Sequence, residues 1–298
     1  MKPVDALALG WRTELIFHRF DAQVVERPDC LVVRTPHNPT FYWGNFLLFD
    51  RPPCEGDAAR WIALFEAQIA SVQPESRHLA FGIDGAAPER LPEDFATRGV
   101  TMFRSTVLTL RREQLRAPRK PLGAGFTQRA LRLPAEAPQA VALQVASDAH
   151  GHEPAGYRVF RERQMARYGR MVAAGLGDWF GVFAAAATAD GGERLVADCG
   201  LFRDGHGEGA LGRFQFVSTH PDWRRRGLCS ALIHAVCRRG FEVMGLSSLV
   251  IVADPDDVAI GLYEALGFVR DHRLWYLERR QAADRAAVRT GPKPTSRS

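Results

Sequence analysis

The chain has 298 residues, a length that favours two domains, and its 46% hydrophobic and 24% charged residues are typical of a globular protein. Its five cysteines are odd in number and lack CxxC spacing, which argues against a disulfide framework or a zinc site and favours free thiols in a reducing cytoplasm. No apolar run is long enough to cross a bilayer and the first residues lack a secretory cleavage site, so neither a membrane span nor secretion is expected.

The net charge of +5 comes from one end of the chain. Residues 279–298 hold six basic side chains against the single acidic residue Asp284, which accounts for the whole excess. The remainder is balanced, so the charge argues against a nucleic-acid partner, although a weak contact through this basic tail stays open. We expect the tail to be disordered.

The first half of the chain predicts three strands and one helix. The strands are expected at 41–49, 78–84 and 105–110, and the helix at 57–70, where apolar residues recur at helical spacing. A basic stretch rich in proline and glycine then follows. We therefore divide the chain into a domain at 1–115, a linker at 116–125 and a second domain at 126–278.

The second half repeats elements of the same kind. Strands are expected at 126–133, 179–188, 194–202, 210–219 and 247–254, and helices at 137–149, 157–175 and from 228 onward, with a last helix and strand after 254. A turn with hairpin chemistry lies at 189–193. Because both halves run strand, loop, helix, strand, short helix, strand, we expect an α/β fold with a mixed sheet and two similar domains in tandem.

Three consecutive arginines at 224–226 and Gly227 stand directly before a helical pattern that starts at Leu228. The first turn of a helix has backbone N–H groups without intrahelical partners and a partial positive charge, so added cations are unfavourable unless an anion compensates. Gly227 lets a ligand approach the backbone, and Cys229 and Ser230 are small. The loop suits a phosphate or diphosphate, although taken alone it also fits a basic surface cluster beside a turn.

Residues 217–232 resemble the acetyl-coenzyme A loop of the GNAT superfamily of N-acetyltransferases, in which a strand ending V/T-x-P precedes R/Q-x-x-G-x-G/A and a helix. Arg224, Gly227 and Cys229 take the positions of the second pattern, with Cys229 in place of the usual Gly or Ala. A second stretch, 254–268, is similar to the family's N-x-x-A-x-x-L/F-Y-x-x-x-G-F. The resemblance covers about 126–278 and implies a mostly antiparallel sheet flanked by helices.

The resemblance also implies a reaction and its residues. Acetyl-coenzyme A would be the co-substrate, without a metal, and its acetyl group would pass to an amine of a small molecule or a protein. Backbone N–H groups of 225–230 would hold the diphosphate, and 217–219 would pair with the pantetheine arm. The residues expected to contact the coenzyme are Val217, Ser218, Thr219, Arg224, Arg225, Arg226, Gly227, Leu228, Cys229, Ser230 and Asp256, which takes the Asn position.

Tyr263 is the candidate general acid for the departing thiolate, and a plain core aromatic is the alternative. The local pattern predicts a helix with Asp254 as its N-cap, Pro255 as its first residue and Gly267 at its end. No general base is assigned, because Ser218 stands where many relatives carry Glu.

The acceptor pocket is expected around 138–175, with 147–158 at its mouth, where Asp148, His150, His152 and Glu153 either face a cationic amine or belong to a solvated loop. In the first half the equivalent stretch, 46–61, contains Pro52 and Pro53, which have no N–H, so we expect one coenzyme site per chain. The alternatives are a coenzyme-binding sensor or scaffold without turnover and a nucleic-acid binder. The acceptor and the oligomeric state are not predicted.

Overall fold

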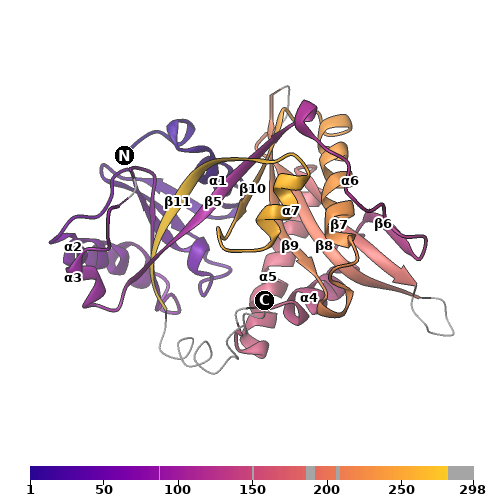
Figure 1. The fold of residues 1–298 in the computed structure, drawn as a ribbon. Helices are drawn as coiled ribbons and strands as arrows, with labels where there is room; N and C mark the ends of the chain where they lie inside the picture. The colour runs from indigo at the N-terminus through magenta and orange to yellow at the C-terminus, as the bar shows by residue number, and fades with distance from the viewer. Residues whose placement is uncertain (87, 150, 186–191, 206–208, 281–298) are drawn as a thin grey trace, which may run out of the picture.

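The computed structural model describes the whole chain except residues 87, 150, 186–191, 206–208 and 281–298. Its strands form one sheet in the order β1-β2-β3-β4-β11-β5-β10-β9-β8-β7-β6 (Figure 1). The bounds are β1(Gln23–Glu26), β2(Cys30–Arg34), β3(Phe46–Phe49), β4(Leu79–Ile83), β5(Thr101–Arg111), β6(Phe126–Ala130), β7(Gly177–Ala185), β8(Glu193–Arg203), β9(Leu211–Thr219), β10(Ser248–Ala253) and β11(Val269–Arg279). Only β3–β4 and β9–β10 pair in parallel among these described strands, so the expected mixed, mostly antiparallel sheet is confirmed.

Helices cover both faces of the sheet. They are α1(Leu9–Asp21), α2(Asp57–Phe65), α3(Glu93–Ala96), α4(Ala137–Ala146), α5(Pro154–Ala173), α6(Leu228–Glu242) and α7(Ala259–Ala265). In the first half α2 packs on one face and α1 on the other. In the second half α6 and α7 share one core with the sheet, and α4 and α5 form the opposite core, which α1 also joins.

Most predicted elements are present, with differences at their ends. The strand expected at 41–49 is a 3₁₀ turn at Tyr42–Gly44 followed by β3, and the helix expected at 57–70 is α2 followed by a π-helical turn at Glu66–Ala70. The sequence analysis missed α1, β1 and β2. The predicted hairpin turn at 189–193 and the basic tail fall largely outside the described residues. None of the described helices combines the length and the apolar character needed to cross a membrane.

The two halves exchange a strand. The last strand of the chain, β11, lies between β4 and β5, and β5 in turn lies between β11 and β10. The registers pair Tyr276 with Gly82 and Val250 with Thr109. Each half is thus completed by a strand of the other, and Figure 1 shows β5 and β11 running between the two halves. The sequence did not predict this exchange.

The parallel strands β9 and β10 diverge at their carboxyl ends. They pair only through 211–213 and 248–250. Beyond that point β9 continues to Thr219 along β8, and β10 continues to Ala253 along β5. The register between β8 and β9 slips between Asp198 and Gly200, and Phe216 has a φ of 43°, which identifies a β-bulge at this point. The divergence leaves one edge of β9 without a partner among the described strands where α6 begins.

Candidate functional site

The start of α6 offers a row of free backbone donors. The helix begins at Leu228, as predicted, and Gly227 occupies the N-cap with a φ of 81°. The N–H groups of residues 225–230 donate to no acceptor in the described part of the chain, and the next amide, that of Ala231, bonds to the Gly227 carbonyl at 3.0 Å. Arg225 also has a positive φ of 63°, a conformation that costs a non-glycine residue about 1–2 kcal/mol. Unpaired amides in a strained loop at a helix start form a site for an anion.

Cations surround these amides. Arg224, Arg225 and Arg226 are exposed. The Nε of Arg224 donates to the Thr219 carbonyl at 3.2 Å, and the Arg226 guanidinium lies 4.7 Å from the Trp223 ring. None of the three forms an ion pair with the described carboxylates. Their charge therefore remains available to a ligand held by the amides.

The linker contributes to the same corner. A Cβ placed on Gly227 would lie 3.2 Å from the Cβ of Lys120. A side chain at 227 would therefore meet both an unfavourable φ and a close neighbour, so the glycine keeps the backbone open. The residues fit a diphosphate, because the amides, the left-handed glycine and the surrounding cations all match an anion of that size.

The predicted pantetheine-binding segment lies on the open edge of β9. Ser218 is buried, with 7% of its surface exposed, while Val217 and Thr219 are half-buried. Leu228 lies in the core, so only its backbone faces a ligand. Asp256 is exposed, and its N–H donates to the Asp254 carboxylate at 2.9 Å.

The helix that carries Tyr263 starts one turn later than predicted. Asp254 is not its N-cap and Pro255 is not its first residue, because α7 begins at Ala259. Asp254 instead closes a turn through the Asp256 N–H, and Asp257 accepts the N–H of Ala259 at 2.9 Å. Two successive aspartate turns thus delay the helix.

The predicted end of this helix is confirmed. Gly267 has a φ of 103°, and the N–H of Phe268 donates to the Tyr263 carbonyl at 3.1 Å. A Cβ on Gly267 would lie 1.9 Å from the Gln114 carbonyl oxygen, so only glycine fits.

Tyr263 is buried, with 4% of its surface exposed. Burial raises the pKa of its phenol well above the usual value, with smaller contributions from Cys229, Asp257 and Cys199. The phenol therefore stays protonated at neutral pH and is able to donate a hydrogen bond. Burial also raises the pKa of the Cys229 thiol to about 12, which excludes a thiolate nucleophile at neutral pH. Tyr263 of α7 and Cys229 in the first turn of α6 belong to the same packed core.

A buried carboxylate that the sequence analysis missed lies on the other face of the sheet. Asp198 of β8 has no exposed surface and pairs with Ser218 of β9 in the strand register. Its carboxylate accepts hydrogen bonds from the Ser218 hydroxyl, from Gln144 Nε2 at 2.9 Å and from Trp179 Nε1 at 2.9 Å. Burial raises its pKa to about 6, against these three bonds, which lower it. The sequence signal was a single acid inside an apolar strand.

The predicted mouth of the acceptor pocket is held by local bonds. Asp148 accepts the His152 N–H at 2.7 Å and lies 3.0 Å from its Nδ1. Glu153 accepts the N–H groups of Ala155 and Gly156 and so caps α5. His150 lies outside the described residues. The two carboxylates thus shape the loop that leads into α5.

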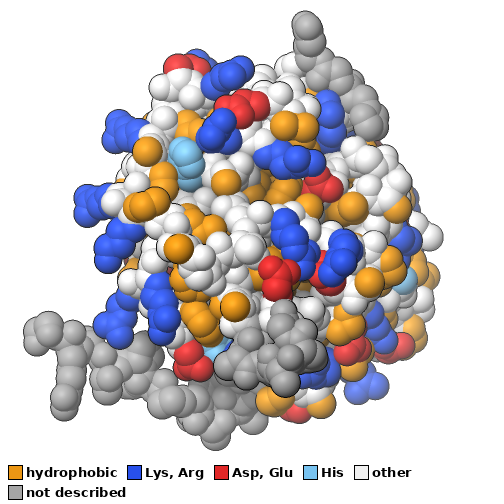
Figure 2. Space-filling view, turned by 90° about the vertical axis from the view of Figure 1, so that its right-hand side faces the viewer, with side chains coloured by type: hydrophobic (Ala, Val, Ile, Leu, Met, Phe, Trp, Pro, Cys, Tyr) orange, Lys and Arg blue, Asp and Glu red, His pale blue; other side chains and the backbone are white. Residues whose placement is uncertain are grey.

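The described residues include no group of three or more His, Cys, Asp or Glu placed to hold a metal ion. On the face that Figure 2 shows, Lys and Arg side chains gather along the left side, and acidic side chains lie among basic ones elsewhere.

The diverging parallel strands and the open helix start between them define a GNAT fold. Residues 144–268 match the model of the Acetyltransferase (GNAT) family. No match was found among curated proteins.

Solved structures support the fold over both halves. A conserved protein of unknown function from Staphylococcus epidermidis ATCC 12228 aligns with a TM-score of 0.62 at 15% identity, covering 87% of this chain and 94% of its own. A GCN5-related N-acetyltransferase from Kribbella flavida gives 0.59 at 17%, covering 93% and 98%. A tandem GNAT protein from the clavulanic acid biosynthesis pathway gives 0.52 at 14%, covering 92% of each chain. At these identities the likeness concerns the fold, which includes a tandem arrangement.

Proposed function

We propose that the protein is an acetyl-coenzyme A-dependent N-acetyltransferase with one coenzyme site per chain, at the junction of β9, β10 and α6. The observation that carries the proposal is the row of unpaired amides at 225–230 beside the open edge of β9. A diphosphate bound there would satisfy donors that otherwise lack partners within the described protein.

The bound coenzyme supplies an activated acetyl thioester. In the proposal the amides of 225–230 hold its diphosphate, Arg224, Arg225, Arg226 and Lys120 balance the charge, and Val217–Thr219 hold its arm. Tyr263 stands on the α6 and α7 face with its phenol protonated, and it donates that proton to the departing thiolate.

The attacking amine must be neutral, so it has to lose a proton. The Ser218 hydroxyl, bonded to the Asp198 carboxylate, lies on the α4 and α5 face. We infer that Ser218 accepts the amine proton while passing its own to Asp198. The acid then protonates the departing thiolate from one face of the sheet, and the base takes the amine proton from the other.

The test compares the wild-type chain with Tyr263→Phe. Calorimetry with acetyl-coenzyme A should give one site per chain for both proteins, with affinities that agree within about twofold. Release of free coenzyme thiol with a panel of amines should fall about 100-fold in the variant, because a general acid contributes on that order.

A coenzyme-binding sensor or scaffold is the competing function. It would bind the coenzyme but release no thiol with any amine in the wild-type chain. Two equivalent sites per chain, or no binding heat, would contradict the proposal itself.

A further inference from the structure

Three arginines in the second half of the chain are almost fully buried. Arg161, Arg167 and Arg213 expose 3%, 2% and 4% of their surfaces. Arg167 pairs with Asp21 at 2.8 Å, and Arg213 pairs with Glu14 at 2.6 Å. Arg161 has no ion-pair partner among the described carboxylates. A buried guanidinium without a counter-ion is unfavourable, so its presence calls for an explanation.

The hydrogen bonds of Arg161 leave one end of its guanidinium open. Its Nε donates to Gln144 Oε1 at 2.8 Å, a neutral acceptor, while Nη2 is buried and has no hydrogen-bond partner in the described part of the chain. Gln144 Nε2 donates a hydrogen bond to the Asp198 carboxylate, so the nearest acid of this network contacts the Gln144 amide instead of the arginine. Burial lowers the pKa of Arg161, and nearby tyrosines together with Asp198 and Asp148 oppose that shift. Arginine stays charged even so.

Aromatic rings surround this guanidinium. Its Cζ lies 3.5 Å from the ring centre of Phe216, 5.5 Å from that of Phe160 and 5.9 Å from that of Tyr157. Phe216 is the residue of the β9 bulge, with a φ of 43°, and it directly precedes the proposed pantetheine segment in the sequence. Phe160 in turn packs at 5.2 Å on Phe41 of the first half. Aromatic side chains thus form an enclosure around the guanidinium of Arg161, next to the proposed pantetheine segment.

We propose that Arg161 binds the carboxylate of the acceptor, and that the acceptor is a small amine of the amino-acid type, carrying its carboxylate a few bonds from the amine. This inference rests on the proposed function and names its substrate class. One guanidinium balances one monoanionic carboxylate, and its free end matches carboxylate geometry. Because the charge is buried under aromatic rings, a compact ligand reaches it more readily than a folded protein surface does.

The first experiment measures acetyl transfer to matched acceptors. Glycine, β-alanine and γ-aminobutyrate are each compared with the corresponding carboxamide, which keeps the amine and the shape but not the charge. The wild-type chain should prefer the acid for at least one of the three by about 30-fold in kcat/KM, as expected for a charge-assisted hydrogen bond. In Arg161→Met the preference should fall to near unity, whereas in Arg158→Met, an exposed arginine on the same helix, it should persist.

Two further measurements separate binding from folding. Propionate and butyrate, which lack the amine, should raise the melting temperature of the coenzyme-bound wild-type chain but not that of Arg161→Met. Arg161→Met should melt only modestly below the wild type, because it removes the hydrogen bond to Gln144 but no ion pair, while Arg213→Met should melt lower, since it leaves Glu14 unpaired. An aminoalkyl phosphonate tests whether the enclosure prefers a dianion.

The outcomes are distinct. Equal rates for acids and carboxamides in the wild type, a preference unchanged in Arg161→Met, or a stronger response to the phosphonate would overturn the inference. If the coenzyme binds and amines without carboxylates are acetylated, the proposed function stands while this inference fails. If no amine is acetylated but carboxylates still stabilise the chain through Arg161, the site stands and the transferase activity fails.

Discussion

The two halves each contain a parallel strand–helix–strand unit, β3-α2-β4 and β9-α6-β10, and only the second is open. Both helices start at a glycine in the left-handed conformation, Gly56 with a φ of 90° and Gly227 with a φ of 81°. At α2 the N–H groups of Gly56 and Ala58 donate to the Asp94 carboxylate at 3.0 and 2.9 Å. The chain's own acid thus occupies the position that α6 leaves free for an anion.

The strands of the two units also differ. β3 and β4 stay paired to their carboxyl ends, where Phe49 lies opposite Ile83 and the Phe49 carbonyl accepts the Asp84 N–H at 2.7 Å. β9 and β10 separate six residues before β9 ends. A paired edge has no backbone donors or acceptors left for a pantetheine arm, so the first unit cannot receive the coenzyme in this way.

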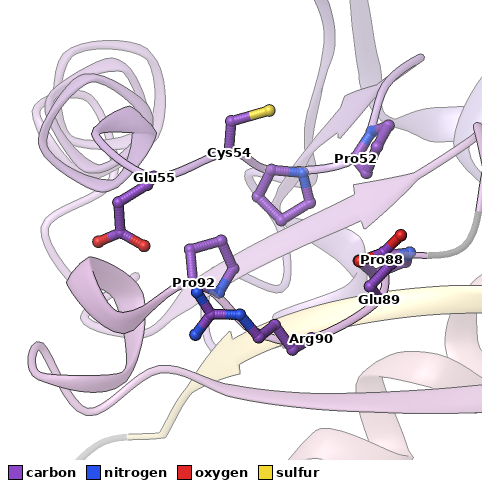
Figure 3. A pocket seen from close by; sticks show the side chains of 8 residues that line it. Pro52, Cys54, Glu55, Pro88, Glu89, Arg90 and Pro92 are labelled. Atoms are coloured by element: carbon purple, nitrogen blue, oxygen red, sulfur yellow. The ribbon is translucent and has the colours of Figure 1, made fainter.

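The hollow beside α2 is also unsuited to a diphosphate. It is lined by Pro52, Pro53, Cys54, Glu55, Pro88, Glu89, Arg90 and Pro92, most of which Figure 3 labels. Four prolines offer no N–H, and two glutamates repel a diphosphate. In the first unit an internal carboxylate, paired strands and prolines occupy the place of an anion site, while the helix start keeps the same backbone shape as that of α6.

The largest expected effect concerns the hydrogen-bonded pair Ser218 and Asp198, which distinguishes the β9-α6-β10 unit from the β3-α2-β4 unit. Ser218 of β9 is bonded to Asp198, whereas β3 is apolar throughout. Ser218→Ala should lower kcat by about 100-fold, the order expected for a lost proton acceptor. Because the pKa of Asp198 is raised to about 6, its carboxylate form is lost below that pH, so the wild-type kcat/KM should fall as pH drops through about 6.

In Ser218→Ala that acidic limb should disappear, as measured by a pH profile from 5 to 9. Ser218→Thr keeps the hydroxyl and serves as the matched control. An unchanged limb in Ser218→Ala would assign it to another group and remove the relay.

The two left-handed glycines form a matched pair of smaller expected effect. Alanine at either position costs about 1–2 kcal/mol for its φ, so both variants should lose stability in chemical denaturation, and Gly227→Ala should lose somewhat more because its Cβ would also lie 3.2 Å from that of Lys120. Only Gly227→Ala should weaken acetyl-coenzyme A, by about tenfold in Kd, because relaxation of its backbone turns amides away from the diphosphate. Equal affinity in both variants, measured by calorimetry, would mean that the coenzyme does not use the α6 start.

The smallest expected effect concerns the closed unit. Asp94→Ala removes the cap of α2 and should cost about 1 kcal/mol in the free energy of unfolding. Asp94→Asn keeps an oxygen acceptor and should cost less. Neither variant should gain a second coenzyme site, because the prolines and the paired strands remain. A second binding event in Asp94→Ala would show that this carboxylate alone closes the unit.

Local patterns in the sequence were enough to predict the backbone of the proposed coenzyme loop. The start of α6 at Leu228, the left-handed Gly227 and the end of α7 at Gly267 all follow from residues within one turn of each other, and the structure confirms them. The start of α7 was predicted wrongly, because Asp254 and Asp257 compete as caps for neighbouring turns and periodicity does not rank them.

The sequence by itself predicted the GNAT fold of the second half and the position of its proposed anion loop, since both predictions rest on motifs of residues that are neighbours along the chain. Tertiary structure alone decided the exchange of β5 and β11, the burial of Asp198 against Ser218 and the lack of an ion-pair partner for Arg161 among the described carboxylates. These features join residues far apart in sequence, and the pKa or charge balance of each depends on the burial that packing creates. Hydrophobic periodicity shows which face of an element is buried, but not which strand or side chain it meets there.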